Sequence, residues 1–295
     1  MNKSKLVTII TPTYNRGNRL QNLYNSLLKQ SCYDFKWIII DDGSTDNTRQ
    51  RVKEFIQEND KFTIKYYCKK NDGKHRALNF IFEKLDTTLM LIIDSDDYLV
   101  ENGIEKIKYY WNKYSNESFS TLTFERLFEN GKPIAHIKKS EIFEKRDIYP
   151  IKYKELGDYS DVYVTQKLIN YKFPEFENEK FLSEADMYYY LSENNKSIFI
   201  NEPLIVGGYK NDGLTKNIRK IQLKNYQGSM YTSTLLMNKK YPLWFRMKQA
   251  ILYDFIAING SISLFTALKK SQYPKLTAFS LIPALVYTSI YKMKG

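Results

Sequence analysis

The chain has 295 residues, a formal net charge of +12 and 43% hydrophobic residues, which is enough for a large α/β domain with an appendage. Its two cysteines, Cys32 and Cys68, exclude a disulfide framework and give no metal-binding spacing. The sequence starts with a strand pattern and has little cysteine, so we expect the catalytic part to be cytoplasmic.

The excess positive charge belongs to the C-terminal part of the chain. Residues 1–214 hold 32 Lys and Arg against 32 Asp and Glu, whereas residues 215–295 hold 13 basic residues and one acid, Asp254. The balanced main part shows no recognition motif or basic stripe, so nucleic acid is not expected as a partner. A basic tail beside apolar segments is typical of contact with anionic lipid.

Strand and helix patterns alternate through the first hundred residues. The predicted strands are residues 6–10, 37–40, 62–67 and 89–93. Apolar residues recur at helical spacing after the first two strands, and a third helix opens within residues 72–79. This alternation predicts an open, mostly parallel sheet that binds its ligand at the carboxyl ends of the strands.

Three carboxylates follow the fourth predicted strand within four positions: Asp94, Asp96 and Asp97. They repel one another, so a divalent cation or a ligand with cation-bound phosphates would stabilise them. The alternative is an exposed acidic turn before the helix predicted at residues 102–113.

Four motifs in this order resemble those of inverting nucleotide-sugar glycosyltransferases of family 2, which have the GT-A fold. They are T-P-T-Y-N-R at residues 11–16, D-D-G-S-T-D at 41–46, G-K-H-R-A-L-N at 73–79 and D-S-D-D at 94–97. Each motif alone is weak, but each stands at the end of a predicted strand or the start of a helix. The chain is similar in particular to bacterial enzymes that build capsular, teichoic-acid or other cell-envelope glycans.

The resemblance implies a donor site and a metal site. Asp96, with Asp94, would bind Mg²⁺ or Mn²⁺, and the metal would neutralise the charge on the leaving diphosphate. The implied donor-site residues are Thr11, Pro12, Tyr14, Arg16, Asp41, Asp42, Lys74, Arg76, Asp94 and Ser95, so Asp94 belongs to both sites. Asp41 would accept the uracil N3–H, and Lys74 and Arg76 would contact ribose or phosphate oxygens.

Structural alternatives exist for several of these residues. Asp41 and Asp42 could form a turn with Gly43, and Thr13 and Asn15 could cap a helix.

The resemblance also implies a base in the acceptor half of the chain. Residues 120–128 and the Asn-Gly pair at 130–131 predict a hairpin, and residues 181–191 predict a helix with a polar start. We expect Glu184, with Tyr188 four positions on, to be the general base, and Asp186 if Glu184 is not. Alternatively, Ser183 caps the helix and the two acids only favour its dipole.

A last strand is predicted at residues 201–209, followed by a loop at 210–216. The resemblance implies that this loop closes over the donor diphosphate, and a plain surface turn is the alternative. The sequence contains no histidine after His136, so a metal here would depend on aspartates, diphosphate and water.

The tail has apolar residues near helical spacing from residue 241 onward, with further apolar segments at 261–268 and 277–291. Asp254 and Pro283 interrupt these segments, and the last has about 15 residues against the roughly 20 needed to cross a bilayer. We expect helices in the membrane interface; packing on the catalytic domain and true insertion are the alternatives. The predicted domains are residues 1–214, with a GT-A fold, and residues 215–295.

The sequence therefore predicts a metal-dependent inverting glycosyltransferase that takes a nucleotide-sugar donor, with UDP favoured. Its acceptor would be a saccharide or a lipid-linked glycan, at the inner face of the cell membrane. A sugar nucleotidyltransferase is the main alternative, although no Gly-rich phosphate loop follows the first strand. A catalytically inactive scaffold with the same fold is the other.

Overall fold

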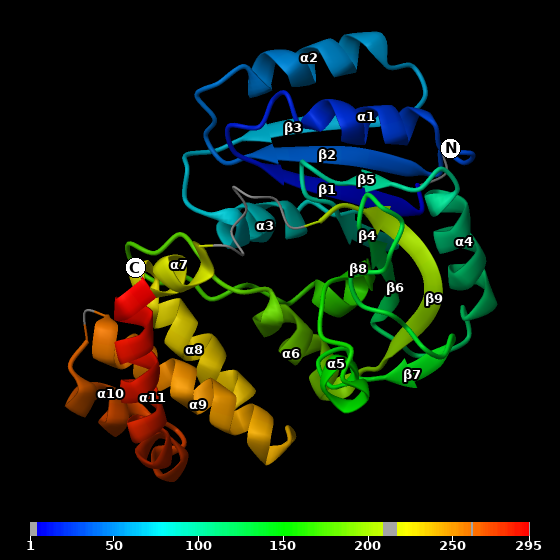
Figure 1. Cartoon of the computed structure of the whole chain (residues 1–295). Helices are drawn as coiled ribbons and strands as arrows, with labels where there is room; N and C mark the ends of the chain where they lie inside the picture. The colour runs from blue at the N-terminus through cyan, green and yellow to red at the C-terminus, as the bar shows by residue number, and fades with distance from the viewer. Residues whose placement is uncertain (1–4, 209–216, 261, 295) are drawn as a thin grey trace. The chain divides into compact units, whose positions relative to one another are not determined.

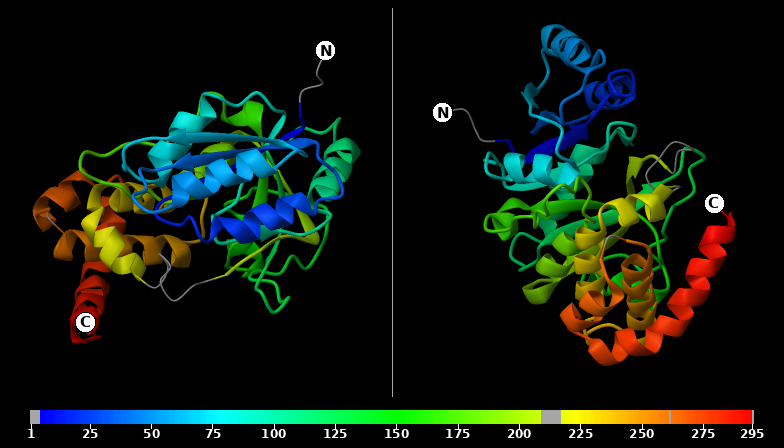
Figure 2. Two further views of the ribbon diagram at one scale, coloured as in Figure 1. Left: turned by 90° about the horizontal axis from the view of Figure 1, so that it is seen from above. Right: turned by 90° about the vertical axis from the view of Figure 1, so that its left-hand side faces the viewer.

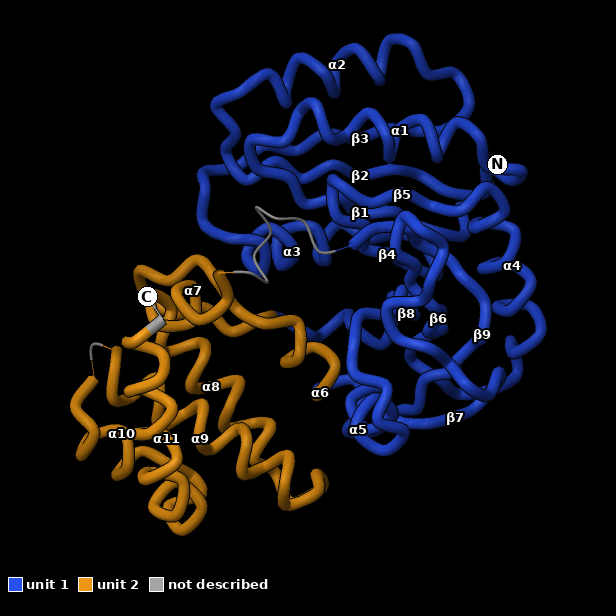
Figure 3. Tube along the Cα trace, in the orientation of Figure 1, with its two compact units in different colours: residues 1–172, 190–209 blue, residues 173–189, 210–295 orange. Residues whose placement is uncertain are grey.

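The computed structural model describes residues 5–208, 217–260 and 262–294. The chain forms two compact units (Figure 3): unit 1 contains residues 1–172 and 190–209, and unit 2 contains residues 173–189 and 210–295. The expected domain boundary, between residues 214 and 215, lies outside the described residues. Residues 173–189, which we expected in the catalytic domain, group with the C-terminal helices.

Nine strands of the described residues form one sheet in unit 1, in the order β3-β2-β1-β4-β8-β6-β9-β5, with β7 paired to β9 (Figure 1). The strands are β1 (Val7–Thr13), β2 (Phe35–Asp41), β3 (Thr63–Cys68), β4 (Leu89–Ile92), β5 (Tyr98–Leu99), β6 (Thr121–Leu127), β7 (Ile142–Glu144), β8 (Tyr159–Val164) and β9 (Ser197–Val206).

The first four strands are mutually parallel, with β1 between β2 and β4. Strands β8, β5 and β7 run antiparallel to their neighbours, while β6 and β9 are parallel to each other. The mixed, mostly parallel sheet at this end of the chain confirms the predicted fold class. Short apolar strands separated by helices fold this way because parallel strands need long crossovers.

The helices of unit 1 are α1 (Leu20–Leu28), α2 (Thr48–Glu58), α3 (Lys74–Phe82), α4 (Gly103–Lys113), α5 (Tyr149–Tyr153) and the 3₁₀ helix η1 (Thr165–Leu168). Helices α1 and α2 cover one face of the parallel strands and α3 lies on the other (Figures 1 and 2). Right-handed crossovers require this, because the chain moves outward from β1 to β3 and then returns to β4.

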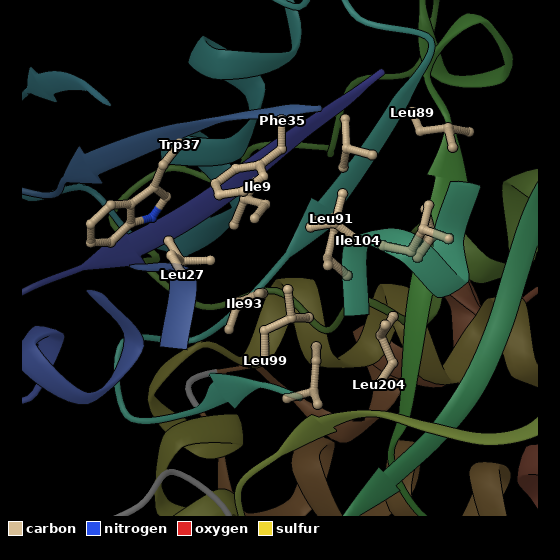
Figure 4. Close-up of a cluster of buried hydrophobic side chains, with 14 of the residues drawn as sticks. Ile9, Leu27, Phe35, Trp37, Leu89, Leu91, Ile93, Leu99, Ile104 and Leu204 are labelled. Carbon is tan, nitrogen blue, oxygen red and sulfur yellow. The ribbon is translucent and has the colours of Figure 1, made fainter. Parts of the chain in front are cut away.

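The main core lies between the sheet and the helices on the α1 side (Figure 4). The inward face of α1 supplies Leu20, Leu23 and Leu27, which recur at intervals of three and four. They pack with strand residues such as Trp37 and Leu91, which are fully buried. This packing fixes the strand ends on which the predicted motifs lie.

The predicted hairpin after residue 120 forms only in part. The turn is present, because the N–H of Phe128 donates to the carbonyl of Lys132 at 2.8 Å. A single bridge joins Leu127 and Pro133, and the long partners of β6 are β8 and β9. The Asn-Gly pair therefore predicts the turn correctly. The pairing of β6 could not be predicted in the same way, because its partner strands lie far away in the sequence.

Helix α6 (Ala185–Asn194) begins in unit 2 and ends in unit 1. The remaining helices belong to unit 2: α7 (Ile218–Lys224), α8 (Tyr226–Leu236), α9 (Leu243–Asn259), α10 (Leu264–Lys270) and α11 (Pro274–Lys294). Helix α9 packs against α8, α10 and α11 around a core that includes Met237 and Phe255.

Helix α11 is longer than the sequence indicated. It has 21 residues, because the helix starts at Pro274, where a proline fits, and continues through Pro283. In the described part of the chain it is the one helix long and apolar enough to cross a membrane, by length and composition alone. The expectation that this segment is too short to span therefore fails on length.

Candidate active site

The carboxyl ends of β1, β2, β3 and β4 lie at one edge of the sheet in unit 1. This follows from their parallel pairing, in which Thr13 stands opposite Asp41 and Ile10 opposite Ile92. All four motifs recognised in the sequence lie at or just beyond these strand ends. Ligands of open α/β sheets bind at this edge, so the motifs share one candidate site.

The D-S-D-D motif forms a tight turn after β4. The backbone N–H of Asp97 donates to the carbonyl of Asp94 at 3.1 Å. We call residues 94–97 the acid turn. Lys74, at the start of α3, donates to Asp94 Oδ1 at 2.7 Å, and 43% of the Asp94 side chain is exposed. Asp94 is therefore accessible to a ligand, with a cation already beside it.

Two arginines contact the second acid of the turn. Asp96 pairs with Arg16 at 3.0 Å and with Arg19 at 3.3 Å. Arg16 comes from the loop after β1, and Arg19 directly precedes α1. Together with Lys74 they place three positive side chains around two carboxylates, a combination that suits phosphate oxygens as well as acids.

Asp94 favours its charged form. Burial alone would raise the pKa of Asp94, but Lys74, Arg126 and Arg16 outweigh that effect and hold the pKa below its usual value. The carboxylate is therefore ionised at neutral pH, as a metal or cation ligand must be.

The third acid of the turn, Asp97, binds another side chain of the protein. Asp97 is buried and forms an ion pair with Arg126 of β6. Burial raises the pKa of Asp97 to about 7; Arg126 opposes the rise, while Asp94 and Asp96 add to it. A Cβ at Gly207 would lie 1.6 Å from Asp97 Oδ1, so only glycine fits beside this carboxylate. Asp97 thus joins the acid turn to β6 and lies close to Gly207, which follows β9.

The acid turn suits a hard divalent cation that takes few protein ligands. Asp94 and Asp96 offer carboxylate oxygens, and Mg²⁺ commonly binds one or two carboxylates together with substrate phosphates. Within residues 5–208, 217–260 and 262–294, no group of three His, Cys, Asp or Glu is arranged to hold a metal. A cation here would complete its shell with donor phosphate and water.

Asp41 ends β2 and is fully buried. Its Oδ1 accepts the N–H of Ser44 at 2.8 Å, and its Oδ2 accepts the hydroxyl of Tyr66 at 2.6 Å. Gly43 has φ +81°, a conformation that favours glycine. These contacts favour the turn-forming alternative for Asp41, and its contact with uracil stays a prediction.

Asp42 organises the loop that leads into α3. Its carboxylate accepts the backbone N–H groups of Asp72 at 2.9 Å and Gly73 at 2.7 Å, and it pairs with Lys69 at 3.0 Å. Arg76, in the first turn of α3, pairs with Asp72 of this loop at 2.8 Å. Asp42 and Arg76 therefore position the segment that carries Lys74; direct contact of either with a donor stays a prediction.

The T-P-T-Y-N-R motif presents buried and exposed side chains in turn. The hydroxyl of Thr11 accepts from Trp37 Nε1 at 2.9 Å, so it supports the fold. Tyr14 is exposed and Pro12 half-buried, which leaves both surfaces open to a ligand. Thr13 Oγ1 is buried at the site edge and has no hydrogen-bond partner among the described residues.

The remaining loop residues hold the edge together. Asn15 Oδ1 accepts the N–H of Thr45 at 2.7 Å, and the N–H of Asn15 donates to Ser44 Oγ at 2.8 Å. Asn15 therefore joins two loops, a role different from the helix cap considered above. Ser95 is buried within the acid turn, and its donor contact stays a prediction.

The two candidate bases belong to unit 2. Glu184 directly precedes α6, is half-buried, and accepts the hydroxyl of Tyr188 at 3.3 Å, the pairing that the sequence indicated. Asp186 is buried and accepts the hydroxyl of Tyr231 from α8 at 3.0 Å. Glu184 is therefore the more exposed of the two carboxylates, and the role of either as a base stays a prediction.

Ser183 also caps this helix start. Its Oγ accepts the N–H of Ala185 at 3.2 Å, so the capping alternative is present beside any catalytic role. The loop predicted to close over the diphosphate, at residues 210–216, lies outside the described residues.

Residues 8–170, more than half of the chain, match the family described as "Glycosyl transferase family 2". The chain belongs to this family. The resemblance seen in the four motifs is therefore confirmed, and the match includes all four.

Several curated relatives of this family 2 chain align with less than half of it. An uncharacterized glycosyltransferase of Rickettsia bellii is 32% identical over 131 residues, which are 44% of this chain and 18% of that protein. The putative teichuronic acid biosynthesis glycosyltransferase TuaG of Bacillus subtilis is 29% identical over 133 residues, 45% of this chain and 52% of TuaG. The chain thus covers less than two thirds of the length of these relatives.

A Campylobacter jejuni protein aligns along nearly all of the family 2 chain. It is named GalNAc(5)-diNAcBac-PP-undecaprenol beta-1,3-glucosyltransferase, and it is 24% identical over 291 residues, 94% of this chain and 91% of that protein. The alignment therefore extends through both units.

Solved structures show the same fold. S. aureus TarS 1-349 superposes with a TM-score of 0.66 at 18% identity, covering 98% of this chain and 92% of TarS 1-349. Its complex with UDP-GlcNAc gives 0.64 at 18% identity, over 94% and 79% of the two chains. The mannosyltransferase PcManGT of Pyrobaculum calidifontis, in complex with GDP-Man and Mn2+, gives 0.54 at 15% identity, over 96% and 86%.

Several residues of the family 2 site were not selected from the sequence. Arg19 and Arg126 pair with the acid turn, yet their own surroundings in the sequence carry no signal beyond their charge. The sequence indicates only a possible helix cap for Thr13, because the lack of a hydrogen-bond partner for its hydroxyl among the described residues depends on the fold.

The segment before the candidate bases is held by the C-terminal helices, which the sequence did not indicate. Glu179 accepts the N–H groups of Gln227 at 2.8 Å and Gly228 at 2.9 Å, at the start of α8. In return, Asn225 Oδ1 accepts the N–H groups of Lys180 at 2.8 Å and Phe181 at 3.1 Å. We call these four hydrogen bonds the α8 clamp. Its partners lie more than 40 positions apart, so no local pattern could reveal it.

Proposed function

We propose that the chain is an inverting glycosyltransferase that takes a sugar from a nucleotide-diphosphate donor, with a UDP-sugar favoured. The observation that carries this proposal is the acid turn of a family 2 chain, where Asp94 and Asp96 stand among Arg16, Arg19 and Lys74. The TarS complex with UDP-GlcNAc supports a UDP-sugar as the donor, whereas the PcManGT complex shows the same fold with GDP-Man.

Donor binding would replace the present ion pairs. Lys74 and the two arginines would turn from the carboxylates to phosphate oxygens, leaving Asp94 and Asp96 to hold Mg²⁺ or Mn²⁺. A bound divalent cation would neutralise the charge that develops on the leaving diphosphate. Tyr14 and Pro12 would face the nucleoside, because their side chains have exposed surface available for contact.

Glu184 would take the proton from the attacking acceptor hydroxyl. Inversion requires the hydroxyl to attack opposite the leaving group, so we look for the base on a segment other than the one that holds the metal and diphosphate. Glu184 meets that requirement because it precedes α6 rather than following β4. The Tyr188 hydroxyl bonded to Glu184 would orient the carboxylate.

We propose a saccharide or lipid-linked glycan of the cell envelope as the acceptor. Support comes from two relatives, one named for teichuronic acid biosynthesis and one for an undecaprenol-linked acceptor. An acceptor in the membrane also agrees with the basic tail, whose 13 Lys and Arg meet one acid. We therefore place the enzyme in the cytoplasm, peripheral on the inner face of the cell membrane, through residues 241–295.

The test measures UDP or GDP release from a panel of sugar nucleotides, with Mg²⁺, with Mn²⁺ and with chelator. We expect release with a UDP-sugar that requires metal and increases when a lipid-linked saccharide is added. Pyrophosphate formation from a nucleoside triphosphate and a sugar phosphate would instead indicate a nucleotidyltransferase. Absence of turnover with the whole panel, in a protein that still binds UDP, would indicate a scaffold.

A further inference from the structure

Helix α11 exposes an apolar face to the surroundings of unit 2. Phe279 is 78% exposed, Ile282 74% and Met293 79%, and Val286 and Leu285 are more than half exposed. Phe279, Ile282, Val286 and Met293 follow one another at spacings of three, four and seven, so they share one side of the helix. We call this side, with Leu285, the outer face of α11.

The side of α11 that packs inside unit 2 combines small and polar residues with the rings of Tyr287 and Tyr291, which contact Phe255. Thr277, Ser280, Ala284 and Thr288 are buried against the unit, in contact with α9. Ser280 donates to the buried carboxylate of Asp254, and Asn259 donates to Thr288 Oγ1 at 2.9 Å. Soluble surface helices expose a polar side, whereas α11 exposes an apolar side in addition to the one that packs inside unit 2.

Charge is placed only at the ends of this helix. Lys275 and Lys292 are exposed, and residues 276–291 between them contain no charged side chain. At a rise of about 1.5 Å per residue, this uncharged stretch is roughly 24 Å long. Lys269 and Lys270, at the end of α10, are also exposed. They precede α11 in the sequence and add two positive charges to that of Lys275 at its start.

We propose that the outer face of α11 lies in the interface of an anionic phospholipid bilayer, with the helix parallel to the membrane plane. The apolar face would enter the acyl boundary while the terminal lysines contact lipid phosphates, the arrangement of interfacial helices. Ser280 and Thr288 bind polar partners of α9 within unit 2, so this side of α11 packs on protein and not on lipid. This inference rests on the proposed membrane location and not on the proposed chemistry.

The test uses full-length protein and vesicles of phosphatidylcholine with and without phosphatidylglycerol. Wild-type protein should sediment with the anionic vesicles and be partly released by high salt. Ile282→Asp should lower the partition coefficient roughly tenfold or more, because a charge would enter the acyl boundary. Ile169→Asp is the matched control, since Ile169 is a 75% exposed isoleucine in unit 1, and it should bind as the wild type does.

Three results would overturn the proposal. Equal vesicle binding by Ile282→Asp and the wild type would show that the outer face of α11 does not contact the membrane, even if the basic tail still attracts lipid. Retention of the wild type on vesicles in both high salt and alkaline carbonate would indicate a spanning helix. A wild-type dimer without lipid that Ile282→Asp converts to a monomer would assign the face to a second copy. UDP release should be unchanged in Ile282→Asp, which separates this failure from a failure of the proposed chemistry.

Discussion

Among the residues of the acid turn, we expect the charge of Asp96 to matter most for turnover. Its carboxylate stands between Arg16 and Arg19, and the proposed donor and metal would exchange with those arginines. Asp96→Asn keeps the size of the side chain and removes the anionic ligand. We expect turnover to fall by at least about 100-fold, since several kcal/mol of charge stabilisation corresponds to such a factor.

The same variant should remain folded. The ion pairs of Asp96 with Arg16 and Arg19 are partly exposed, so the free energy of unfolding should change by no more than about 1 kcal/mol. Asp60→Asn, at an exposed aspartate remote in sequence from the motifs, is the control and should keep normal turnover. Metal-dependent UDP binding, measured by calorimetry, should be lost in Asp96→Asn only. Wild-type turnover in Asp96→Asn would remove Asp96 from the site.

Glu184 and Asp186 are distinguished by their environments. We expect Glu184→Gln to lower the rate of sugar transfer by about two to four orders of magnitude while leaving UDP affinity unchanged, because a base acts on the acceptor. Asp186→Asn should mainly affect stability, since it disturbs the hydrogen bond with Tyr231. Single-turnover transfer and UDP titration measure the two effects. If both variants transferred sugar at the normal rate, the base would lie elsewhere.

At the scale of secondary structure, the parallel strands and the helices around them followed from hydrophobic periodicity. Runs such as residues 37–40 and 89–93 are short and continuously apolar, which is the pattern of strands buried on both faces. The site motifs could be placed because they follow those strands directly. The pairing of β6 with β8 and β9 could not be read, because strand pairing depends on register between distant segments.

The α8 clamp predicts that a residue outside the recognised motifs affects transfer. Glu179→Gln leaves one oxygen where a carboxylate now accepts two N–H groups at the start of α8. We expect a loss of roughly 1–2 kcal/mol in the free energy of unfolding and a lower rate of transfer, because the segment before Glu184 loosens. UDP affinity should not change, since the donor motifs belong to unit 1.

Glu193→Gln is the matched control for the clamp, because Glu193 is an exposed glutamate at the end of α6. It should keep wild-type stability and transfer. Restoring the carboxylate as Glu179→Asp should recover part of the transfer rate. Reduced stability with an unchanged transfer rate in Glu179→Gln would show that the clamp supports the fold and does not position the base.

Asp254 makes the contact between α9 and α11 sensitive to pH. Burial raises the pKa of Asp254 to about 6, and the hydrogen bond from Ser280 offsets only part of that rise. Between about pH 4 and pH 6 the folded state keeps a proton that the unfolded state releases, so this contribution to stability falls as the pH rises. Above pH 6 it is lost completely.

Asp254→Asn should remove this dependence while keeping an acceptor for Ser280. We expect the free energy of unfolding of the variant to exceed that of the wild type by up to about 3 kcal/mol above pH 6. Below pH 4 the two values should differ little. Urea unfolding of both proteins from pH 4 to pH 8 measures this difference in free energy. All other groups titrate in both proteins, so their contributions cancel when the two values are subtracted. A difference that does not vary with pH would show that Asp254 is ionised in the folded protein throughout.

At the scale of the whole chain, the distribution of charge indicated two parts. It did not indicate that residues 173–189 belong with the second part. The basic tail distinguished residues 215–295 from the rest, whereas the assignment of residues 173–189 to unit 2 depends on the α8 clamp. This changes how the tail should be studied. Met237 and Ala250 share one core, so a chain ending near residue 239 would expose the apolar side of α8 and disturb the clamp. Substitutions in the full-length chain test the tail more cleanly than truncation does.

The distribution of charge between the two parts predicts where membrane attachment resides. Lysines near an anionic membrane contribute on the order of 1 kcal/mol each, so the exposed Lys269, Lys270 and Lys275 together should change vesicle partition by roughly 100-fold. We expect the triple Lys→Gln variant at these positions to lose most of its binding to anionic vesicles at low salt.

The matched control replaces three exposed lysines of unit 1, Lys53, Lys132 and Lys139, with glutamine. Both triple variants lower the formal charge from +12 by three, so any difference between them reports position and not net charge. The difference should shrink as salt rises, because the Debye length falls from about 10 Å at 0.1 M to about 3 Å at 1 M. Equal loss of vesicle binding in both variants would mean that attraction to the membrane is spread over the whole chain. The tail would then no longer support a lipid-linked acceptor.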